Sequence, residues 1–359
     1  MKKNTAILHP FIAHYRNDFF RLLNQKTGTD IYVFEDKRKV QSDFFQIADI
    51  PVIPIRNVQR KGVLWYNPFA LLKKEYKVLV LMLHFAHLTT WLLLVTKFIH
   101  RKKIILWGQG ISVKRYLKEE KKPDWKLKKM MQMSDVVWLY MEKEQQQWQK
   151  ILPGKKITAL KNTISDVERI ASYKPVLSRE EIKKKYNITQ PILLIFCARF
   201  SNAYRRPDLL ESVIQSLDVN KFGFIIIGDG EHKPDFTAYS HVYEFGAVYD
   251  FQLKSDLFFI SDIYFQPAWV GLSIVEAMAY GKPILTFKRT AEILQCVEYS
   301  YIFDNWNGKI VDNILFCVDF INQSDKQSWN LMGQHAREYV LENLTPELMA
   351  KRAINSLTE

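Results

Sequence analysis

Cysteine is scarce in this chain of 359 residues. Its three cysteines, Cys197, Cys296 and Cys317, lie far apart, and none belongs to a Cys-x-x-Cys pair. This spacing excludes a disulfide framework and a cysteine-based zinc site, and it fits a reducing compartment. The first residues form a basic tip with too little apolar sequence for a signal peptide, so we expect a cytoplasmic protein.

Long uninterrupted apolar runs are also missing. The most apolar stretch, residues 78–95, carries two histidines and two threonines near its middle, where polar groups cost most in a bilayer. A strand over 78–83, a turn and a helix over 89–99 explain this stretch better than a membrane span does.

Apolar and aromatic residues, by contrast, make up 48% and 14% of the chain, which is enough for substantial cores. Short apolar segments alternate with helical ones, the pattern of parallel α/β sheets. The expected strands cover residues 5–9, 30–34, 78–83, 103–107, 136–140, 192–197, 222–227, 242–245, 263–265 and 284–287.

The length of the chain indicates two domains. Residues 165–190 are polar and contain no strand candidate, so they separate two α/β series. We expect a first domain over residues 1–165 and a second over 166–345. A C-terminal helix over 346–359 is expected to pack back on the first domain.

Positive charge is concentrated in one segment. The chain carries a net charge of +13, and residues 97–129 supply +9 of it, with twelve basic and three acidic residues. Aromatic side chains are interleaved with these cations. An anionic membrane surface attracts such a segment by about 1 kcal/mol per basic residue, with aromatic rings at headgroup level. A solvated charged face explains the segment equally well, and no nucleic-acid motif accompanies it.

Residues 264–287 form the best-defined local unit. A strand end leads into a loop containing Gly271, a helix over 272–280 follows, and a second strand closes the unit. In parallel sheets ligands bind at the carboxyl ends of the strands, and the N–H groups at the start of this helix suit a diphosphate. Ser273 and Glu276 also have the spacing of a capping box, which does not exclude a ligand.

Three more loops follow strands of the second domain. Arg199 and Arg205 lie six residues apart after the first of these strands, where both guanidinium groups could reach one pyrophosphate. A Gly-Asp-Gly turn at 228–230 ends a buried strand, and Phe-Gly-Ala-Val at 245–248 ends another. Each pattern is common by itself, so the information lies in the order and spacing of all four elements.

With these motifs in this order, residues 190–290 resemble the donor domain of the retaining GT-B glycosyltransferases of family 4. That family has an arginine loop with a second cation six residues later, a Gly-Asp-Gly turn, a Phe/Gly/Val loop and a Glu-x7-Glu motif. The motif ends in Glu-Ala-Met-Ala-x-Gly-x-Pro, which residues 276–283 match. The resemblance implies an α/β fold of the GT-B type, with two Rossmann-like domains that face each other across a cleft.

The resemblance also implies roles for single residues. Arg199 and Arg205, the latter in place of the family's usual lysine, are expected to bind the donor diphosphate, and Glu276 to accept hydrogen bonds from the ribose. These three are the catalytic candidates. The other donor-binding candidates are expected to contact the base or the phosphates through their backbone or loop: Gly228, Asp229, Val248, Gly271, Leu272 and Ser273.

One position departs from the family pattern. The first Glu of the motif, which contacts the donor sugar in the family, corresponds to Ala268. The loop at 267–272 resembles that of a subgroup with Pro-x-x-Val-Gly-Leu in place of this Glu. We therefore interpret Ala268 as a subgroup feature, although it leaves the donor-sugar contact unassigned.

The first domain is expected to bind the acceptor. Candidate residues lie at or after the expected strand ends, and they are His9, His14, Arg16, His84 and Gln109. A structural role stays open for each histidine. The family's usual glycine-rich loop is absent here, and many relatives have a histidine near position 109. Because no carboxylate or cysteine accompanies His84 and His87, we expect no metal site.

No Asp-x-Asp occurs in the sequence, so the carboxylates that usually hold a nucleotide diphosphate through a metal are missing. We therefore expect a bacterial-type hexosyltransferase that needs no metal and no cofactor. It would move a sugar, with retention, from a nucleotide diphosphate sugar to a lipid-linked glycan in cell-surface polysaccharide assembly. It would work at the inner face of the cytoplasmic membrane, docked through residues 97–129.

Two alternatives stay open. One is a sugar-nucleotide epimerase on the same fold, for which the sequence offers no recognisable acid/base set. The other is a non-catalytic sugar-nucleotide-binding relative, a reading that Ala268 motivates.

Overall fold

The computed structural model describes residues 4–35 and 47–358, and the chain divides into two compact units. The N-terminal unit holds Met1–Ser165 and Thr345–Glu359, and the C-terminal unit holds Asp166–Leu344. Among the described residues, no helix is both long and apolar enough to cross a bilayer.

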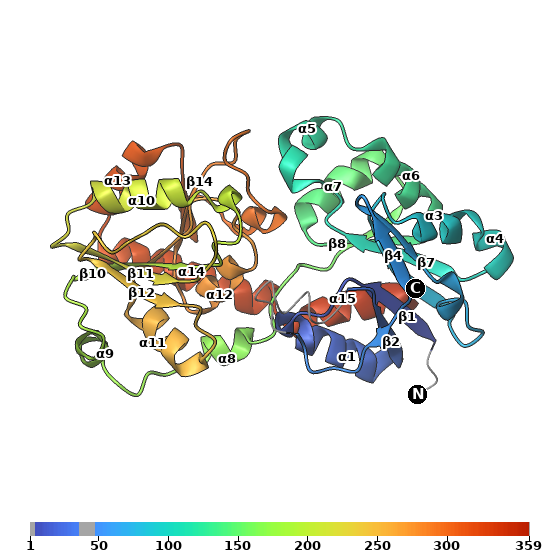
Figure 1. The fold of residues 1–359 in the computed structure, drawn as a ribbon, viewed down its shortest axis with the longest axis horizontal. Helices are drawn as coiled ribbons and strands as arrows, with labels where there is room; N and C mark the ends of the chain where they lie inside the picture. Colours follow the sequence, from blue (N-terminus) through green and yellow to red (C-terminus); the bar gives the residue numbers. More distant parts are fainter. Residues whose placement is uncertain (1–3, 36–46, 359) are drawn as a thin grey trace. The chain divides into compact units, whose positions relative to one another are not determined.

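The N-terminal unit contains a parallel sheet with the strand order β3-β2-β1-β6-β7-β8-β9. Strands β1, β2, β7 and β8 are labelled in Figure 1. Its inner strands are buried on both faces, which explains their continuous apolar sequences. The order reverses between β1 and β6, so a switch point lies at the carboxyl ends of these strands. The strands are β1 (Thr5–His9), β2 (Thr29–Val33), β3 (Ile53–Pro54), β6 (Val78–Met82), β7 (Lys103–Gly108), β8 (Val136–Leu139) and β9 (Lys156–Ala159).

Helices cover both faces of this sheet. On one face, α1 (Asn17–Thr27) and α15 (Pro346–Thr358) share a core with alternate strand residues. On the other face, the core includes residues of α3 (Leu88–Val95), α6 (Trp125–Met133) and α7 (Glu142–Ile151). The short helices α4 (Lys97–His100) and α5 (Tyr116–Lys121) belong to the same unit.

The expected single helix over 89–99 is wrong. Helix α3 ends at Val95, and Thr96 Oγ1 donates to the carbonyl of Leu92 at 2.8 Å, which closes its last turn. Helix α4 then begins at Lys97. The sequence also gave no sign of β9 or of the antiparallel hairpin β4 (Asn57–Arg60) and β5 (Val63–Tyr66).

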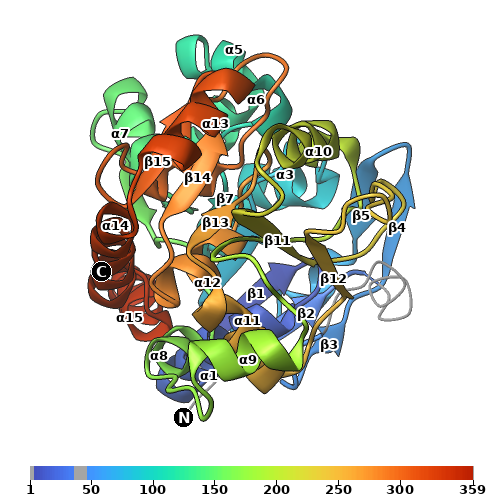
Figure 2. The same ribbon diagram turned by 90° about the vertical axis from the view of Figure 1, so that its left-hand side faces the viewer.

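The C-terminal unit has a parallel sheet with the order β12-β11-β10-β13-β14-β15, and most of these strands are labelled in Figure 2. Four of its strands have the bounds expected from the sequence. The strands are β10 (Ile192–Cys197), β11 (Phe222–Ile227), β12 (Val242–Gly246), β13 (Ile263–Phe265), β14 (Ile284–Phe287) and the unpredicted β15 (Gly308–Val311). The helices are α8 (Val167–Ala171), α9 (Arg179–Lys185), α10 (Pro207–Ser216), α11 (Phe251–Ile260), α12 (Ser273–Ala279), α13 (Ile314–Gln323) and α14 (Lys326–Asn343).

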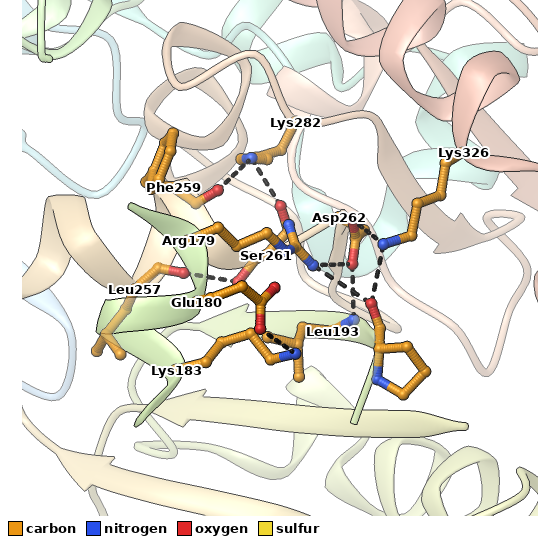
Figure 3. A network of polar contacts seen from close by, with 11 residues as sticks. Arg179, Glu180, Lys183, Leu193, Leu257, Phe259, Ser261, Asp262, Lys282 and Lys326 are labelled. Atoms are coloured by element: carbon orange, nitrogen blue, oxygen red, sulfur yellow. Dashed lines mark hydrogen bonds and ion pairs between the residues drawn. The ribbon is translucent and has the colours of Figure 1, made fainter. Parts of the chain in front are cut away.

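A network of charged side chains ties the amino ends of β10 and β13 together (Figure 3). Asp262 accepts the Leu193 N–H at 2.8 Å and pairs with Arg179 at 2.7 Å. Lys326 donates to the Pro191 carbonyl at 2.9 Å. The network joins α9 and α14 to the sheet at the edge opposite to the carboxyl ends. We therefore assign it a structural role. The loops that carry the site candidates lie at the other side of the sheet, where the strands end.

Candidate functional site

The donor-side candidates gather at the switch point of the C-terminal unit. The strand order reverses between β10 and β13, and ligands in such sheets bind at the carboxyl ends of the strands on either side. The loop after β10 carries Arg199 and Arg205, and the loop after β13 carries residues 267–272. The structure thus places the two predicted phosphate-binding loops next to each other.

Two glycines allow the loops after β10 and β11 to pack backbone against backbone. Gly228 has φ +144°, and a Cβ there would lie 2.0 Å from the Ala198 carbonyl oxygen. Gly230 has φ +142°, and its Cβ would lie 2.6 Å from the carbonyl carbon of Phe200. Because no side chain fits at either position, the Gly-Asp-Gly turn supports the loop that bears Arg199. Asp229 contributes through its backbone, since its carbonyl accepts the Phe200 N–H at 2.8 Å.

Arg205 is a half-buried cation. Burial lowers the pKa of its guanidinium, and Arg199 lowers that pKa further, so the two arginines lie close enough to repel each other. The Nε atom of Arg205 is buried and has no hydrogen-bond partner among the described residues. Two clustered guanidinium groups with an unfilled hydrogen-bonding site favour an anionic ligand.

Two buried glutamines fix the loop after β13. The Gln266 side chain donates to the carbonyls of Ala268 and Trp269, at 3.0 Å each. Gln295 accepts the Val270 N–H at 3.0 Å and donates to the Pro267 carbonyl at 3.2 Å. Within the described part of the chain, the N–H groups of residues 271–273 donate to no carbonyl. They are therefore available to a ligand.

The expected capping box is wrong. Helix α12 begins without a side-chain cap, because Ser273 Oγ donates to Gln266 Oε1 at 2.8 Å. The buried Gln266 oxygen takes a second hydrogen bond from the Tyr264 hydroxyl at 2.7 Å. A buried amide needs its partners, and this requirement outweighs the local cap.

Glu276 forms an ion pair that the sequence did not reveal. Its Oε1 lies 3.1 Å from Nζ of Lys254, a residue of α11. Burial lowers the pKa of Lys254, but the Glu276 carboxylate together with Cys197 and Tyr280 raises it, so the pKa lies above its ordinary value. Nothing in the sequence around Lys254 signals this pairing, which depends on how α11 packs beside α12.

Ala268 is fully buried. Its methyl group cannot make the polar contact of the Glu that the resemblance leads one to expect at this position. The next residue, Trp269, has φ +55°, a left-handed conformation that is strained for a large side chain. Its ring stacks on that of Tyr204 at 5.1 Å and 21°. This aromatic pair joins the loop after β10 to the loop after β13, and sequence reasoning missed it. Val248, two residues after β12, is buried as well.

In the N-terminal unit, His9 and Arg16 come together beside Trp107. His9 is the last residue of β1, and its ring lies 5.4 Å from that of Trp107. Burial, and secondarily Arg16, lowers the pKa of His9 to about 3, so its imidazole is neutral at physiological pH. The Arg16 guanidinium is buried 5.2 Å from the Trp107 ring and 5.3 Å from that of Tyr140. The two aromatic partners were not among the candidates.

The remaining acceptor-side candidates are more scattered. His84 is exposed and stacks on Phe85 at 5.3 Å, while His87 is buried, and burial lowers the His87 pKa to about 4. The two imidazole rings lie 4.8 Å apart. His14 is exposed in the turn before α1, and Gln109 follows β7. His9 and His84 thus flank the switch point between β1 and β6. Among residues 4–35 and 47–358, no cluster of three or more metal-ligating side chains occurs.

Residues 178–303 match the family described as Glycosyl transferases group 1. This span contains every donor-side candidate. No curated protein matches the chain.

Solved structures align with nearly the whole chain. Anabaena HepE in complex with UDP and glucose is 13% identical, with a TM-score of 0.65 over 99% of this chain and 100% of that one. An E. coli structure described as trehalose-6-phosphate bound with UDP-2-fluoro glucose is 9% identical, with a TM-score of 0.66 over 99% of both chains. An S. aureus TarM mutant in complex with fondaparinux, alpha-GlcNAc-glycerol and UDP is 12% identical, with a TM-score of 0.62 over 99% of both chains. These similarities confirm the predicted two-domain α/β fold of the GT-B type.

Proposed function

We propose that the chain is a hexosyltransferase that moves a sugar, with retention, from a nucleotide diphosphate sugar to a glycan acceptor. Arg205 carries the proposal. The residue is half-buried and lies near a second arginine, and its buried Nε has no hydrogen-bond partner among the described residues. Such a cation is costly unless an anion completes it. The match of residues 178–303 to glycosyl transferases group 1 supports a nucleotide diphosphate as that anion.

The proposed donor site uses backbone and side chains together. Arg199 and Arg205 bind the diphosphate and stabilise the charge that develops on it as the sugar leaves. The N–H groups of Gly271, Leu272 and Ser273 add neutral donors. Glu276, oriented by Lys254, accepts the ribose hydroxyls. The backbone near Val248 contacts the base, while Gly228 and Asp229 hold the arginine loop in place.

We further propose that the acceptor is a lipid-linked glycan in cell-surface polysaccharide assembly. It binds the N-terminal unit near His9, His14, Arg16, His84 and Gln109. The transferase works at the inner face of the cytoplasmic membrane, which it reaches through the basic segment 97–129. Catalysis in this proposal needs neither a metal nor a cofactor.

A thermal-shift screen of the full chain with UDP-, GDP- and dTDP-sugars tests the donor site. The correct donor at 100 times its dissociation constant stabilises the fold by about 2.7 kcal/mol. Product analysis with that donor then separates the activities. Transfer that survives a chelator supports the proposal, and transfer that requires a metal contradicts its metal-free form. An isomerised nucleotide sugar formed without acceptor indicates an epimerase. Tight binding with neither hydrolysis nor transfer indicates a binding protein.

A further inference from the structure

The basic segment 97–129 does not form one surface. Residues 97–103 lie at the amino ends of the sheet strands in the N-terminal unit, because Lys103 is the first residue of β7. Residues 114–129 follow the carboxyl end of β7 and build α5 and the start of α6. In a parallel sheet all strands begin on one side and end on the other, so these two groups lie on opposite sides. We call the side where the strands begin the amino edge and the side where they end the carboxyl edge. The amino edge is also opposite to the acceptor-side candidates His9 and His84.

A basic hollow of about 500 Å³ opens at the amino edge. Five of its lining residues are basic and one is acidic: Lys97, Arg101, Lys102, Lys103, Lys156 and Asp135. Lys97 Nζ lies 2.5 Å from the Asp135 carboxylate, so this acid is already paired. The ammonium groups of Lys102 and Lys103 each donate to two backbone carbonyls. The exposed Arg101 and the neighbouring Lys156 add further positive charge to the lining, so the hollow is suited to an anionic group.

Exposed apolar side chains lie beside the hollow on α3 and α4, which adjoin each other in Figure 1. Their exposed fractions are high for large apolar residues: Leu92 46%, Val95 57%, Phe98 76% and Ile99 68%. Helix α4 connects the two features directly. It contributes Phe98 and Ile99 to the apolar cluster and Lys97 to the hollow, and Arg101 caps it.

We propose that this amino-edge face, the hollow together with Leu92, Val95, Phe98 and Ile99, docks on an anionic lipid bilayer. Lipid phosphates occupy the hollow while Phe98 and Ile99 enter the headgroup–acyl boundary. Charge and apolarity side by side suit a bilayer, because its surface offers phosphates and hydrocarbon together. A second copy of the chain would face the same excess of positive charge, and a nucleic acid would leave the apolar cluster in water. The inference rests on the membrane part of the proposed function and confines the docking, within the basic segment 97–129, to residues 97–103.

Sedimentation of the full chain with vesicles tests this face. Vesicles of phosphatidylcholine alone are compared with vesicles containing 30% phosphatidylglycerol. Each basic residue contributes about 1 kcal/mol near an anionic surface, or about fivefold in the partition coefficient. Arg101→Gln with Lys156→Gln should therefore lower binding to anionic vesicles by about 30-fold. Phe98→Ser with Ile99→Ser should lower it by about tenfold or more, because two apolar side chains leave the boundary.

Two matched controls belong to the same unit. Phe69→Ser removes an aromatic side chain that is 77% exposed and lies away from α4 in the sequence. Lys121→Gln with Lys122→Gln removes the same charge from the end of α5. Neither control should change vesicle binding. If Lys121→Gln with Lys122→Gln releases the chain and the α4 variants do not, docking occurs at the carboxyl edge and the inference is wrong.

Three other results also overturn it. These are equal binding to neutral and anionic vesicles, binding to neither, and a dimer in solution that Phe98→Ser with Ile99→Ser dissociates. Sugar-nucleotide binding, measured by thermal shift on the same variants, should not change. A chain that binds anionic vesicles through α4 but binds no nucleotide sugar would contradict the proposed function and leave the docking face intact.

Discussion

Nζ of Lys254 lies 3.1 Å from Oε1 of Glu276, so the carboxylate proposed to bind the ribose is held by a cation from a neighbouring helix. Both side chains are only about one-fifth exposed, at 22% and 20%. The pair is thus sheltered from solvent, and it fixes which way Glu276 points before any ligand arrives.

A double-mutant cycle measures this coupling. In Glu276→Gln the Lys254 ammonium loses its partner, and in Lys254→Met the carboxylate does. Each single variant should lower the free energy of unfolding. Urea unfolding of Lys254→Met, Glu276→Gln and the double variant should give a coupling free energy of about 1.5–3 kcal/mol between the two side chains. The pKa of Lys254 should fall in Glu276→Gln, because burial is then no longer opposed by the carboxylate. Additive losses would show that the pair contributes nothing measurable.

The two arginines of the loop after β10 should matter for binding more than for stability. Arg199→Ala and Arg205→Ala each remove charge-assisted hydrogen bonds worth about 1.5–3 kcal/mol to the diphosphate, so the dissociation constant should rise about 10- to 150-fold. The melting temperature should change little, since neither variant leaves a cavity in a core. Calorimetry with the nucleotide diphosphate checks this.

The control for the arginines is Arg206→Asn. Arg206 neighbours Arg205 but pairs with Asp208 at 2.6 Å, and its backbone has φ +53°, which asparagine tolerates. This variant should bind the diphosphate normally. Normal binding of the diphosphate by the Arg199 and Arg205 variants would contradict the proposal that these two side chains bind it.

The Gly-Asp-Gly turn should tolerate no side chain at its first position. In Gly228→Ala a Cβ meets the Ala198 carbonyl oxygen at 2.0 Å, so the loop before Arg199 must move. We expect a loss of about 3 kcal/mol or more, or failure to fold. Gly246→Ala is the control, because Gly246 also has a positive φ, +61°, but open space around its Cβ position. It should cost only about 1 kcal/mol. Equal unfolding midpoints in urea for the two variants would contradict the close approach.

The free energy of unfolding should fall as the pH is lowered, because His9 takes up a proton more readily in the unfolded chain than in the folded one. Its pKa is about 3 in the folded chain against 6.5 for an ordinary histidine. Between pH 6.5 and 3 the unfolded chain binds a proton that the folded chain excludes, so the free energy of unfolding falls as the pH falls. From pH 6.5 to 5 this amounts to about 2 kcal/mol, at 1.36 kcal/mol per unit. Urea unfolding of His9→Gln should show a pH slope smaller by one proton. The same slope in both proteins would mean that His9 is protonated in the folded chain.

The sequence predicted best where a pattern depends on burial alone. Strands β10 and β11 have the expected bounds because both faces of each are buried, which leaves a continuous apolar run. The hairpin β4–β5 went unpredicted because its strands expose apolar as well as polar residues. Val58 is 65% exposed and Trp65 is 51% exposed. A half-exposed hairpin has no apolar run to recognise.

Within the candidate site, the motifs placed the loops but not their internal contacts. The Gly-Asp-Gly spacing predicted a tight turn at 228–230, but the hydrogen-bonded turn lies one step later, where the Lys233 N–H donates to the Gly230 carbonyl at 3.1 Å. The roles of Gln266 and Lys254 were beyond the sequence, because each depends on a partner brought close by tertiary packing. The capping box failed for the same reason. Ser273 does not cap its helix, because its hydroxyl instead donates a hydrogen bond to the buried Gln266 side chain seven residues earlier.

Helix α15 has a consequence for how the protein is made. It shares a core with α1 and the first sheet, through Met349, Ala350 and Ala353, yet the ribosome synthesises it only after the whole C-terminal unit. The C-terminal unit is continuous in sequence and can fold as soon as it emerges. The N-terminal sheet must wait for roughly 10–40 s of further translation, at 5–20 residues per second. During that time the apolar face of α1 lacks its partner, which makes the nascent chain a natural client for chaperones.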